Sequence, residues 1–152
     1  MNNSNQAEGE RTFGSKSLDE IIKKLQATND IKKRYEYVLW LGKKLPALPE
    51  NLMKDELKVR GCVSQVYVEG RLKEGKIIWR GYSDALITKG LLSLLIEGLS
   101  NLTPNQVMNA DHELIEATGL RASLTPSRAN GFLNILLAMQ KQAQMLNSDP
   151  TS

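Results

Sequence analysis

Cys62 is the only cysteine among the 152 residues, and it directly follows a glycine. The stretch 60–68 reads Arg-Gly-Cys-Val-Ser-Gln-Val-Tyr-Val, and its two-residue period predicts a strand in which Cys62 shares a face with Val66 and Val68. Gly61 lacks a Cβ and can adopt backbone angles closed to other residues, so a turn here can direct the thiol away from the sheet. We interpret the stretch as a device for presenting one sulfur atom.

Three neighbours favour reactivity of this thiol. A single cysteine is otherwise more often a small buried hydrophobic residue than a reactive group. Gly61 gives the turn its freedom, Ser64 offers a hydrogen-bond donor, and Arg60 supplies a positive charge that favours the thiolate. A free thiol has a pKa of about 8.5 and is only slightly ionised at neutral pH, so each of these influences matters to its reactivity.

Composition excludes several classes of protein. Lys and Arg number 20 against 17 Asp and Glu, an excess too small and too dispersed to predict nucleic-acid binding. One cysteine makes no internal disulfide and no cysteine-based metal site unaided, which favours a reducing, cytoplasmic location. The longest apolar run, 85–99, is interrupted by Lys89, Glu97 and two glycines, so no membrane span is expected.

Caps, breakers and periodicity predict the secondary structure. A capping box at Ser17–Glu20 predicts a helix over about 17–27, and Asp30 predicts the start of a second helix that ends before Pro46. Further helices are expected after the caps Ser83 and Asp84, after Thr103-Pro104, over about 111–118 with a stop at Gly119, and over 126–146 after Thr125-Pro126.

Between these helices the sequence predicts strands at 56–60, after Cys62, and at 77–82, with a turn over 72–76. The expected fold is α+β in two layers: a three-stranded antiparallel sheet around residues 57–82 with helices on one face and a largely solvated opposite face. Residues 17–146 are expected to form a single domain, with a disordered tail over 1–16 and a frayed end over 147–152.

The cysteine stretch also resembles a known family. Residues 61–67, Gly-Cys-Val-Ser-Gln-Val-Tyr, resemble the G-C-x-S-x-V-[WY] signature of SufE, with Tyr67 where many members carry tryptophan. Four further blocks match in the same order, and the resemblance covers roughly residues 17–146. These blocks are 34–37 with 41–46, 81–85, 89–90 and 124–128.

The resemblance implies a fold similar to SufE and IscU and a role as sulfur acceptor. The protein would receive persulfide sulfur on Cys62 from a SufS-type cysteine desulfurase, stimulate that enzyme on docking, and pass the sulfur to a SufBCD-like iron–sulfur cluster scaffold. Pyridoxal phosphate belongs to the desulfurase, so no cofactor is expected on this chain. A monomer or weak homodimer is expected, acting as a carrier without independent turnover.

Further candidate site residues come from the same resemblance. Asp84 and Arg128 match positions associated with the cysteine loop or with partner docking, and Glu116 matches one near the docking face. Asp84 could equally be a plain helix cap, whereas Arg128 is electrostatically awkward beside the positive end of a helix and so favours a specific partner. We further expect the Cys62 loop to rest partly shielded, with Asp84 holding that arrangement and Gly61 as the hinge.

Other functions use the same residues differently. An IscU-like scaffold needs several cysteine ligands, which this chain lacks. A cysteine hydrolase or peroxidase would pair Cys62 with a base such as His112, although a histidine beside Glu113 in a polar helix is more typical of an exposed residue. A regulatory interaction module would not need the thiol, and a CsdE-like relay would pass the sulfur to a different acceptor.

Overall fold

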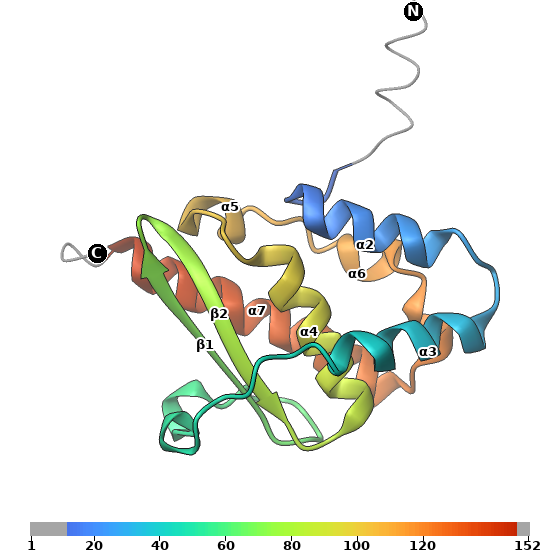
Figure 1. Ribbon diagram of the computed structural model, residues 1–152, viewed down its shortest axis with the longest axis horizontal. Helices are drawn as coiled ribbons and strands as arrows, with labels where there is room; N and C mark the ends of the chain where they lie inside the picture. Colours follow the sequence, from blue (N-terminus) through green and yellow to red (C-terminus); the bar gives the residue numbers. More distant parts are fainter. Residues whose placement is uncertain (1–11, 149–152) are drawn as a thin grey trace, which may run out of the picture.

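The computed structural model describes residues 12–148, which form a bundle of helices packed on a β-hairpin (Figure 1). In chain order, the helices and strands are α2 (Lys16–Gln26), α3 (Ile31–Gly42), η1 (Glu50–Leu52), η2 (Asp55–Leu57), β1 (Val66–Lys73), β2 (Lys76–Ser83), α4 (Leu86–Leu99), α5 (Pro104–Met108), α6 (Leu114–Ala117), η3 (Leu120–Ser123) and α7 (Pro126–Ser148). None of the helices in the described part of the chain combines the length and apolarity that a bilayer span requires.

The hairpin confirms the predicted α+β class with a small antiparallel sheet. Strands β1 and β2 pair from Val66↔Ser83 to Lys73↔Lys76, and the turn between them places Glu74 and Gly75 at positive φ. Within residues 12–148 the sheet has two strands.

The predicted third strand, 56–60, is reduced to a single bridge between Lys58 and Tyr67. The outer edge of β1 is taken by a side chain farther along: Gln142 Nε2 donates to the Val68 carbonyl oxygen at 2.7 Å, and Gln142 Oε1 accepts from Gly70 N at 2.9 Å. Because this amide satisfies the backbone groups that a third strand would need, the pairing cannot continue along β1.

The two faces of the hairpin differ in burial. Val66, Val68, Ile77 and Trp79 are buried on the side covered by α4 and α7 (Figure 1). The opposite face carries half-buried polar and aromatic side chains: Tyr67, Glu69, Arg80 and Tyr82. This face is less solvated than predicted, partly because Arg80 and Glu69 cover each other in an ion pair at 3.1 Å.

Helix α4 is the centre of the fold. It lies between the hairpin on one side and α2 and α3 on the other (Figure 1), and most of its residues are buried. This placement agrees with its sequence, which is too apolar around its circumference for a surface helix. Since α4 is packed on both sides, its first turn is a rigid support for the side chains that contact it.

The N-terminal boundary differs from the prediction. Helix α2 begins at Lys16, and its N-cap is Ser15, whose Oγ accepts from Leu18 N at 3.0 Å, in place of the predicted capping box at Ser17–Glu20. Phe13 is buried and its N–H donates to Asp19 Oδ1 at 2.8 Å, so order extends at least to residue 12. The remainder of the predicted tail, 1–11, and residues 149–152 lie outside the described residues.

Of the other predicted helix caps, those of α5 and α7 are confirmed and those of α4 are not. Thr103 and Gln106 form the predicted capping box, and Thr125 Oγ1 accepts from Arg128 N at 3.3 Å at the start of α7. Ser83 and Asp84, in contrast, do not cap α4: its N-cap is Ala85, which makes no side-chain capping bond. Asp84 instead accepts a hydrogen bond from Gln65 N across the end of the hairpin.

The crossing of α3 and α4 generates a stability prediction. Gly42 and Gly90 meet there so closely that a methyl group at Gly90 would overlap the Val38 carbonyl oxygen. Gly90→Ala should therefore lower the free energy of unfolding by about 2 kcal/mol or more, measured by urea denaturation. Leu86→Ala, on the same helix but exposed, should change it by less than about 0.5 kcal/mol; equal stabilities of the two variants would contradict this packing.

Candidate functional site

Cys62 lies in a loop between η2 and β1, four residues before the strand begins at Val66. The strand phase predicted for Cys62 and Ser64 is therefore wrong. The pairing stops at Val66 because β2 ends opposite it, at Ser83, where the chain turns into α4. The segment 58–65, here called the cysteine loop, has no partner strand over residues 60–65 and is held by side chains.

Helix α7 runs alongside this loop and contacts it from three positions. Arg128, Gly131 and Asn134 are spaced by three residues, which places them on one face of the helix. They contact Ser64, Cys62 and Gly61 respectively, so the loop runs antiparallel to the first turns of α7.

The Cys62 thiol is half-buried and points toward α7. Its Sγ lies 3.7 Å from the Gly131 carbonyl oxygen, to which the S–H donates. Burial raises the pKa of the Cys62 thiol above its ordinary value, because an apolar surrounding disfavours the thiolate. In this arrangement the sulfur is protonated at neutral pH and is a poor nucleophile.

Arg60 does not counteract this effect. Its guanidinium pairs with Asp55 at 2.8 Å, and both side chains are largely exposed. Since desolvation is the cause of the shift in the Cys62 pKa, the prediction that Arg60 promotes the thiolate is wrong for this arrangement of the loop.

Ser64 joins the loop to two helices through one guanidinium. Arg128 Nη1 donates to Ser64 Oγ at 2.9 Å and to Thr88 Oγ1 at 2.6 Å, and the two hydroxyl oxygens lie 3.3 Å apart. Thr88 is buried in the first turn of α4. The cluster therefore ties the cysteine loop to the starts of both α4 and α7.

Asp84 holds the other end of the loop. Its Oδ1 accepts from Gln65 N at 3.0 Å, and its own N–H donates to the Gln65 carbonyl oxygen at 3.2 Å. This pair extends the hairpin pairing by one step beyond Val66 and Ser83. Of the two readings of Asp84, helix cap or loop support, the geometry supports the second.

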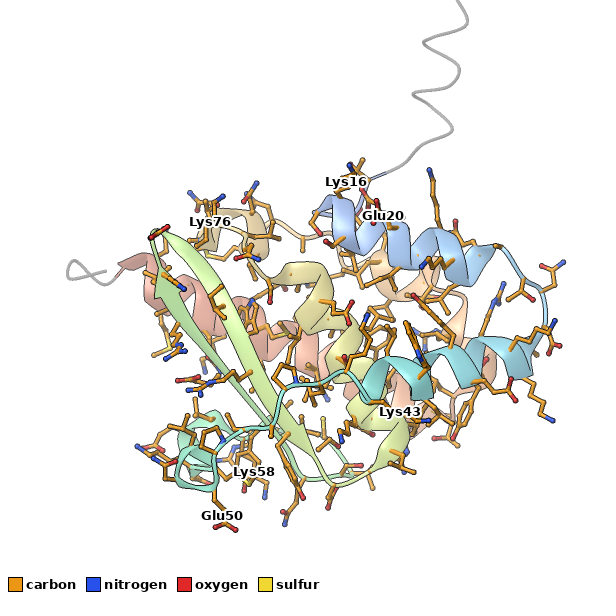
Figure 2. The ribbon with its side chains drawn as sticks, viewed as in Figure 1. Lys16, Glu20, Lys43, Glu50, Lys58 and Lys76 are labelled. Atoms are coloured by element: carbon orange, nitrogen blue, oxygen red, sulfur yellow. The ribbon has the colours of Figure 1, made fainter. Side chains whose placement is uncertain are left out.

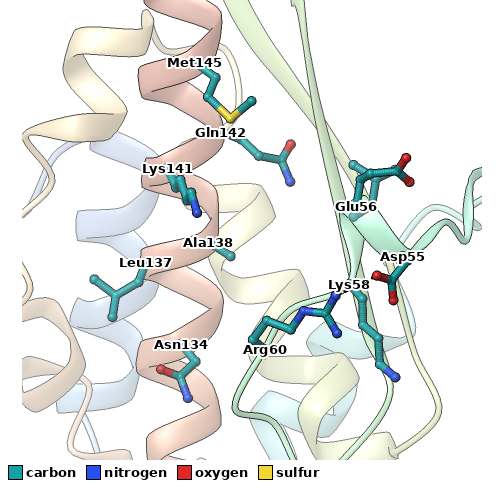
Figure 3. A pocket seen from close by; sticks show the side chains of 11 residues that line it. Asp55, Glu56, Lys58, Arg60, Asn134, Leu137, Ala138, Lys141, Gln142 and Met145 are labelled. Atoms are coloured by element: carbon teal, nitrogen blue, oxygen red, sulfur yellow. Dashed lines mark hydrogen bonds and ion pairs between the residues drawn. The ribbon is translucent and has the colours of Figure 1, made fainter.

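Gly61 has a φ of +79°, a conformation that favours glycine. A Cβ at this position would also lie 2.5 Å from Asn134 Nδ2, the atom that donates to the Gly61 carbonyl oxygen at 2.9 Å. Asn134 and Arg60 line one end of a groove of about 540 Å³ between α7 and the segment 55–60 (Figure 3). The positive φ and the close contact with Asn134 both favour glycine at position 61. The turn that they define sets the direction of Cys62.

Glu116 and His112 lie away from the loop. Glu116, on α6, accepts from Arg121 Nε at 2.8 Å, and this hydrogen bond lowers the pKa of the Glu116 carboxyl. His112 Nε2 lies 2.6 Å from Gln140 Oε1, and Gln140 is nine residues beyond Gly131 on α7, which is roughly 13 Å along the helix. His112 is therefore not placed to act as a base for Cys62.

Four residues that hold the loop were not predicted: Gln65, Thr88, Gly131 and Asn134. Only Gly131 carried a signal, because a glycine inside a predicted helix costs about 1 kcal/mol relative to alanine and usually has a packing reason. The other three are ordinary polar residues whose partners lie 19 to 73 positions away in the sequence. In the described range 12–148, no three His, Cys, Asp or Glu side chains gather as metal ligands.

The hydrogen bonds that Arg128 donates to Ser64 and Thr88 predict how the loop is released. Arg128→Met removes both hydrogen bonds to Ser64 and Thr88 while keeping an unbranched side chain. We expect alkylation of Cys62 by iodoacetamide to accelerate several-fold, because the loop opens more often. Arg71→Met, the same exchange at an exposed position on β1, is the control and should alkylate at the wild-type rate. An unchanged rate in Arg128→Met would contradict a holding role for the cluster.

The pKa of Cys62 gives a second prediction. The pH at which its alkylation rate is half-maximal should lie above the value of about 8.5 for a free thiol. Asp84→Arg removes the acceptor for Gln65 N, so the midpoint should fall toward the free-thiol value and the rate at pH 7 should rise. Asp84→Asn keeps an acceptor oxygen and should resemble wild type, and identical profiles for all three proteins would exclude shielding by the loop.

Comparison with known proteins places this chain in a family. The family model SufE, described as an Fe-S metabolism associated domain, matches residues 19–143. An uncharacterized SufE-like protein of Synechocystis is 50% identical over 127 residues, which cover 84% of this chain and 80% of that protein. The cysteine desulfuration protein SufE of Plasmodium vivax is 43% identical over 116 residues, covering 74% of this chain.

Some relatives are longer. The match covers 46% of the Plasmodium vivax protein and 34% of SufE-like protein 1, chloroplastic/mitochondrial, of Arabidopsis thaliana, which is 39% identical over 127 residues and 83% of this chain. A solution structure of a hypothetical protein from Thermus thermophilus has the same fold, with a TM-score of 0.76 at 22% identity over 88% of this chain and 97% of that one. From the cysteine loop, the fold and these matches together, the chain belongs to the SufE family.

Proposed function

We propose that this protein accepts sulfur on Cys62 from a cysteine desulfurase and carries it to iron–sulfur cluster assembly. The observation that carries the proposal is the placement of Cys62, the only cysteine, in a loop held by side-chain hydrogen bonds, within a SufE-family chain. Such a loop can be released without breaking a helix or the hairpin.

The proposed step is an exchange at sulfur. The desulfurase, which carries its own pyridoxal phosphate, presents a persulfide on its catalytic cysteine. The Cys62 thiolate attacks the outer sulfur, a new S–S bond forms at Cys62, and the S–S bond to the desulfurase breaks. The desulfurase cysteine leaves as a thiolate and takes up the proton that Cys62 lost. The exchange involves no net oxidation or reduction and needs no cofactor on this chain.

The resting loop suits this chemistry. A permanently exposed persulfide would lose its outer sulfur to other cellular thiols by exchange, whereas a shielded sulfur is protected but cannot reach the desulfurase. The desulfurase must therefore bind the open loop more tightly than the closed one in order to shift its population. In this scheme Asp84 and Arg128 hold the closed loop through Gln65 and Ser64, Gly61 is the hinge, and docking stimulates the desulfurase.

Glu116 is the predicted site residue that does not contact the cysteine loop. Its ion pair with Arg121 is exposed and α6 lies beside α2, apart from the cysteine loop (Figure 1). A docking role for Glu116 would therefore require a partner that also covers α6. The proposed acceptor of the sulfur is a SufBCD-like scaffold.

A cysteine hydrolase or peroxidase is disfavoured by the same geometry. Such enzymes activate the thiol with an adjacent base or by lowering its pKa. Here the only histidine contacts Gln140, and burial raises the pKa of the Cys62 thiol. A regulatory interaction module remains the alternative that the test below separates, because it would act without the thiol.

The test is intact-mass analysis after incubation with a SufS-type desulfurase and free cysteine. We expect the wild-type mass to increase by one sulfur atom, with the increase lost on dithiothreitol treatment and absent in Cys62→Ser. Stimulation of the desulfurase should also disappear in Cys62→Ser. Stimulation that persists without the cysteine would favour the regulatory module, and an unmodified wild-type protein would reject the sulfur-carrier function.

A further inference from the structure

Large apolar side chains are exposed beside the cysteine loop. Val63, next to Cys62, and Leu86, the first residue of α4, are each 76% exposed, and Trp40 near the end of α3 is 48% exposed. They are close to one another: Trp40 and Leu86 line the same groove, and the hydroxyls of Ser64 and Thr88, which follow Val63 and Leu86 by one and two residues, lie 3.3 Å apart. We call these three residues the apolar patch.

The groove at this patch is a formed feature of the surface. It measures about 310 Å³ and is lined by Glu36, Leu39, Trp40, Gly42, Lys43, Leu86 and Lys89. Lys43 lies at the end of α3, beside the first turns of α4 (Figure 2). Because α3 and α4 are locked together at Gly42 and Gly90, the groove between their ends is rigid.

The Trp40 ring is held in place before any partner arrives. It stacks on Tyr37 with the ring centroids 5.7 Å apart, and Lys44 Nζ lies 4.7 Å from its centroid. An aromatic ring that is already ordered loses little conformational freedom on binding, which is typical of residues that dominate the affinity of an interface.

The charges around the patch are mainly positive. Lys43, Lys89 and Arg128 border it, and none of the three forms an ion pair with another described residue. Among the described residues, Glu36 is the one acidic residue that lines this groove, and Glu97, which shares another pocket with Trp40, is paired with Lys44. A partner that covers the patch would therefore be favoured by carboxylates around an apolar centre.

We propose that the apolar patch is the surface on which the cysteine desulfurase docks, through an apolar area of the desulfurase bordered by Asp and Glu side chains. This inference rests on the proposed function and assigns its recognition surface. Val63 adjoins Cys62, so a protein seated on the patch lies over the loop that must open. A partner that contacts Leu86 would also touch the first turn of α4, where Thr88 lies. Thr88 and Ser64 of the cysteine loop both accept hydrogen bonds from Arg128.

A second copy of this chain fits the patch less well. In a twofold-symmetric dimer the same surface lies on both sides of the interface, so Lys43 and Lys89 of one copy would approach those of the other. Like charges brought together in this way are unfavourable. Such a dimer would also cover Cys62 with a surface that carries no persulfide.

The experiment measures binding and sulfur transfer separately, with a desulfurase shown to add sulfur to the wild-type protein. Leu86→Ser and Trp40→Ser should each raise the Kd about tenfold, whereas saturating desulfurase should still add one sulfur atom at Cys62. Met145→Ser is the matched control, because Met145 is 65% exposed at the far end of α7 and its loss should leave the Kd unchanged. Unfolding midpoints close to wild type would confirm that all variants are folded.

Charge reversal supplies a second readout. Lys43→Glu with Lys89→Glu should weaken binding at low salt, and the difference from wild type should shrink as salt rises. Lys73→Glu with Lys76→Glu, at exposed positions beside the hairpin turn, is the control pair and should bind as wild type does. The inference is overturned if wild type accepts sulfur while Leu86→Ser and Trp40→Ser bind within twofold of it, or if Met145→Ser weakens binding as much as they do. If wild type accepts no sulfur, the proposed function itself fails.

Discussion

The cysteine loop depends on hydrogen bonds from side chains rather than on a regular backbone ladder. Helix α7 contributes Arg128 and Asn134 as donors and the Gly131 carbonyl oxygen as an acceptor. Each such bond stabilises a fold by only about 1 kcal/mol net, because the groups can bond to water when released. A loop held in this way is ordered at rest but can be displaced by a partner without disturbing the core, since the hairpin and α4 are stabilised independently by apolar burial.

The sequence predicted the features that depend on neighbouring residues. The Thr103–Gln106 box, the cap at Thr125 and the left-handed stop at Gly119 were confirmed because each is a contact among residues a few positions apart. The third strand was not confirmed, because the edge of β1 is satisfied by Gln142, 72 and 74 residues away from its partners. The predicted caps of α4 failed for the same reason: the partner of Asp84 is Gln65 across the hairpin end.

The candidate site divides in the same way. The resemblance identified Cys62 and also Gly61, Ser64, Asp84 and Arg128, which the fold brings together around one loop. It could not show that Thr88 and Asn134 are their partners, because a threonine or asparagine within a helix has no local signature of a distant contact. It also could not show that Arg60 faces Asp55, since the direction of an exposed arginine depends on the tertiary path of the loop.

The position of Arg128 links shielding to recognition. In the closed loop its guanidinium is half-buried and its described hydrogen bonds go to two neutral hydroxyls through one nitrogen. A guanidinium has five N–H donors arranged to match a carboxylate, which would bind it more strongly than hydroxyls do. A partner carboxylate that competes with Ser64 for Arg128 would therefore release the loop at the moment of docking. Opening would then be driven by differential binding of the partner to the open loop, as any ligand-induced change requires, and the sulfur would be exposed only where an acceptor or donor protein already covers it.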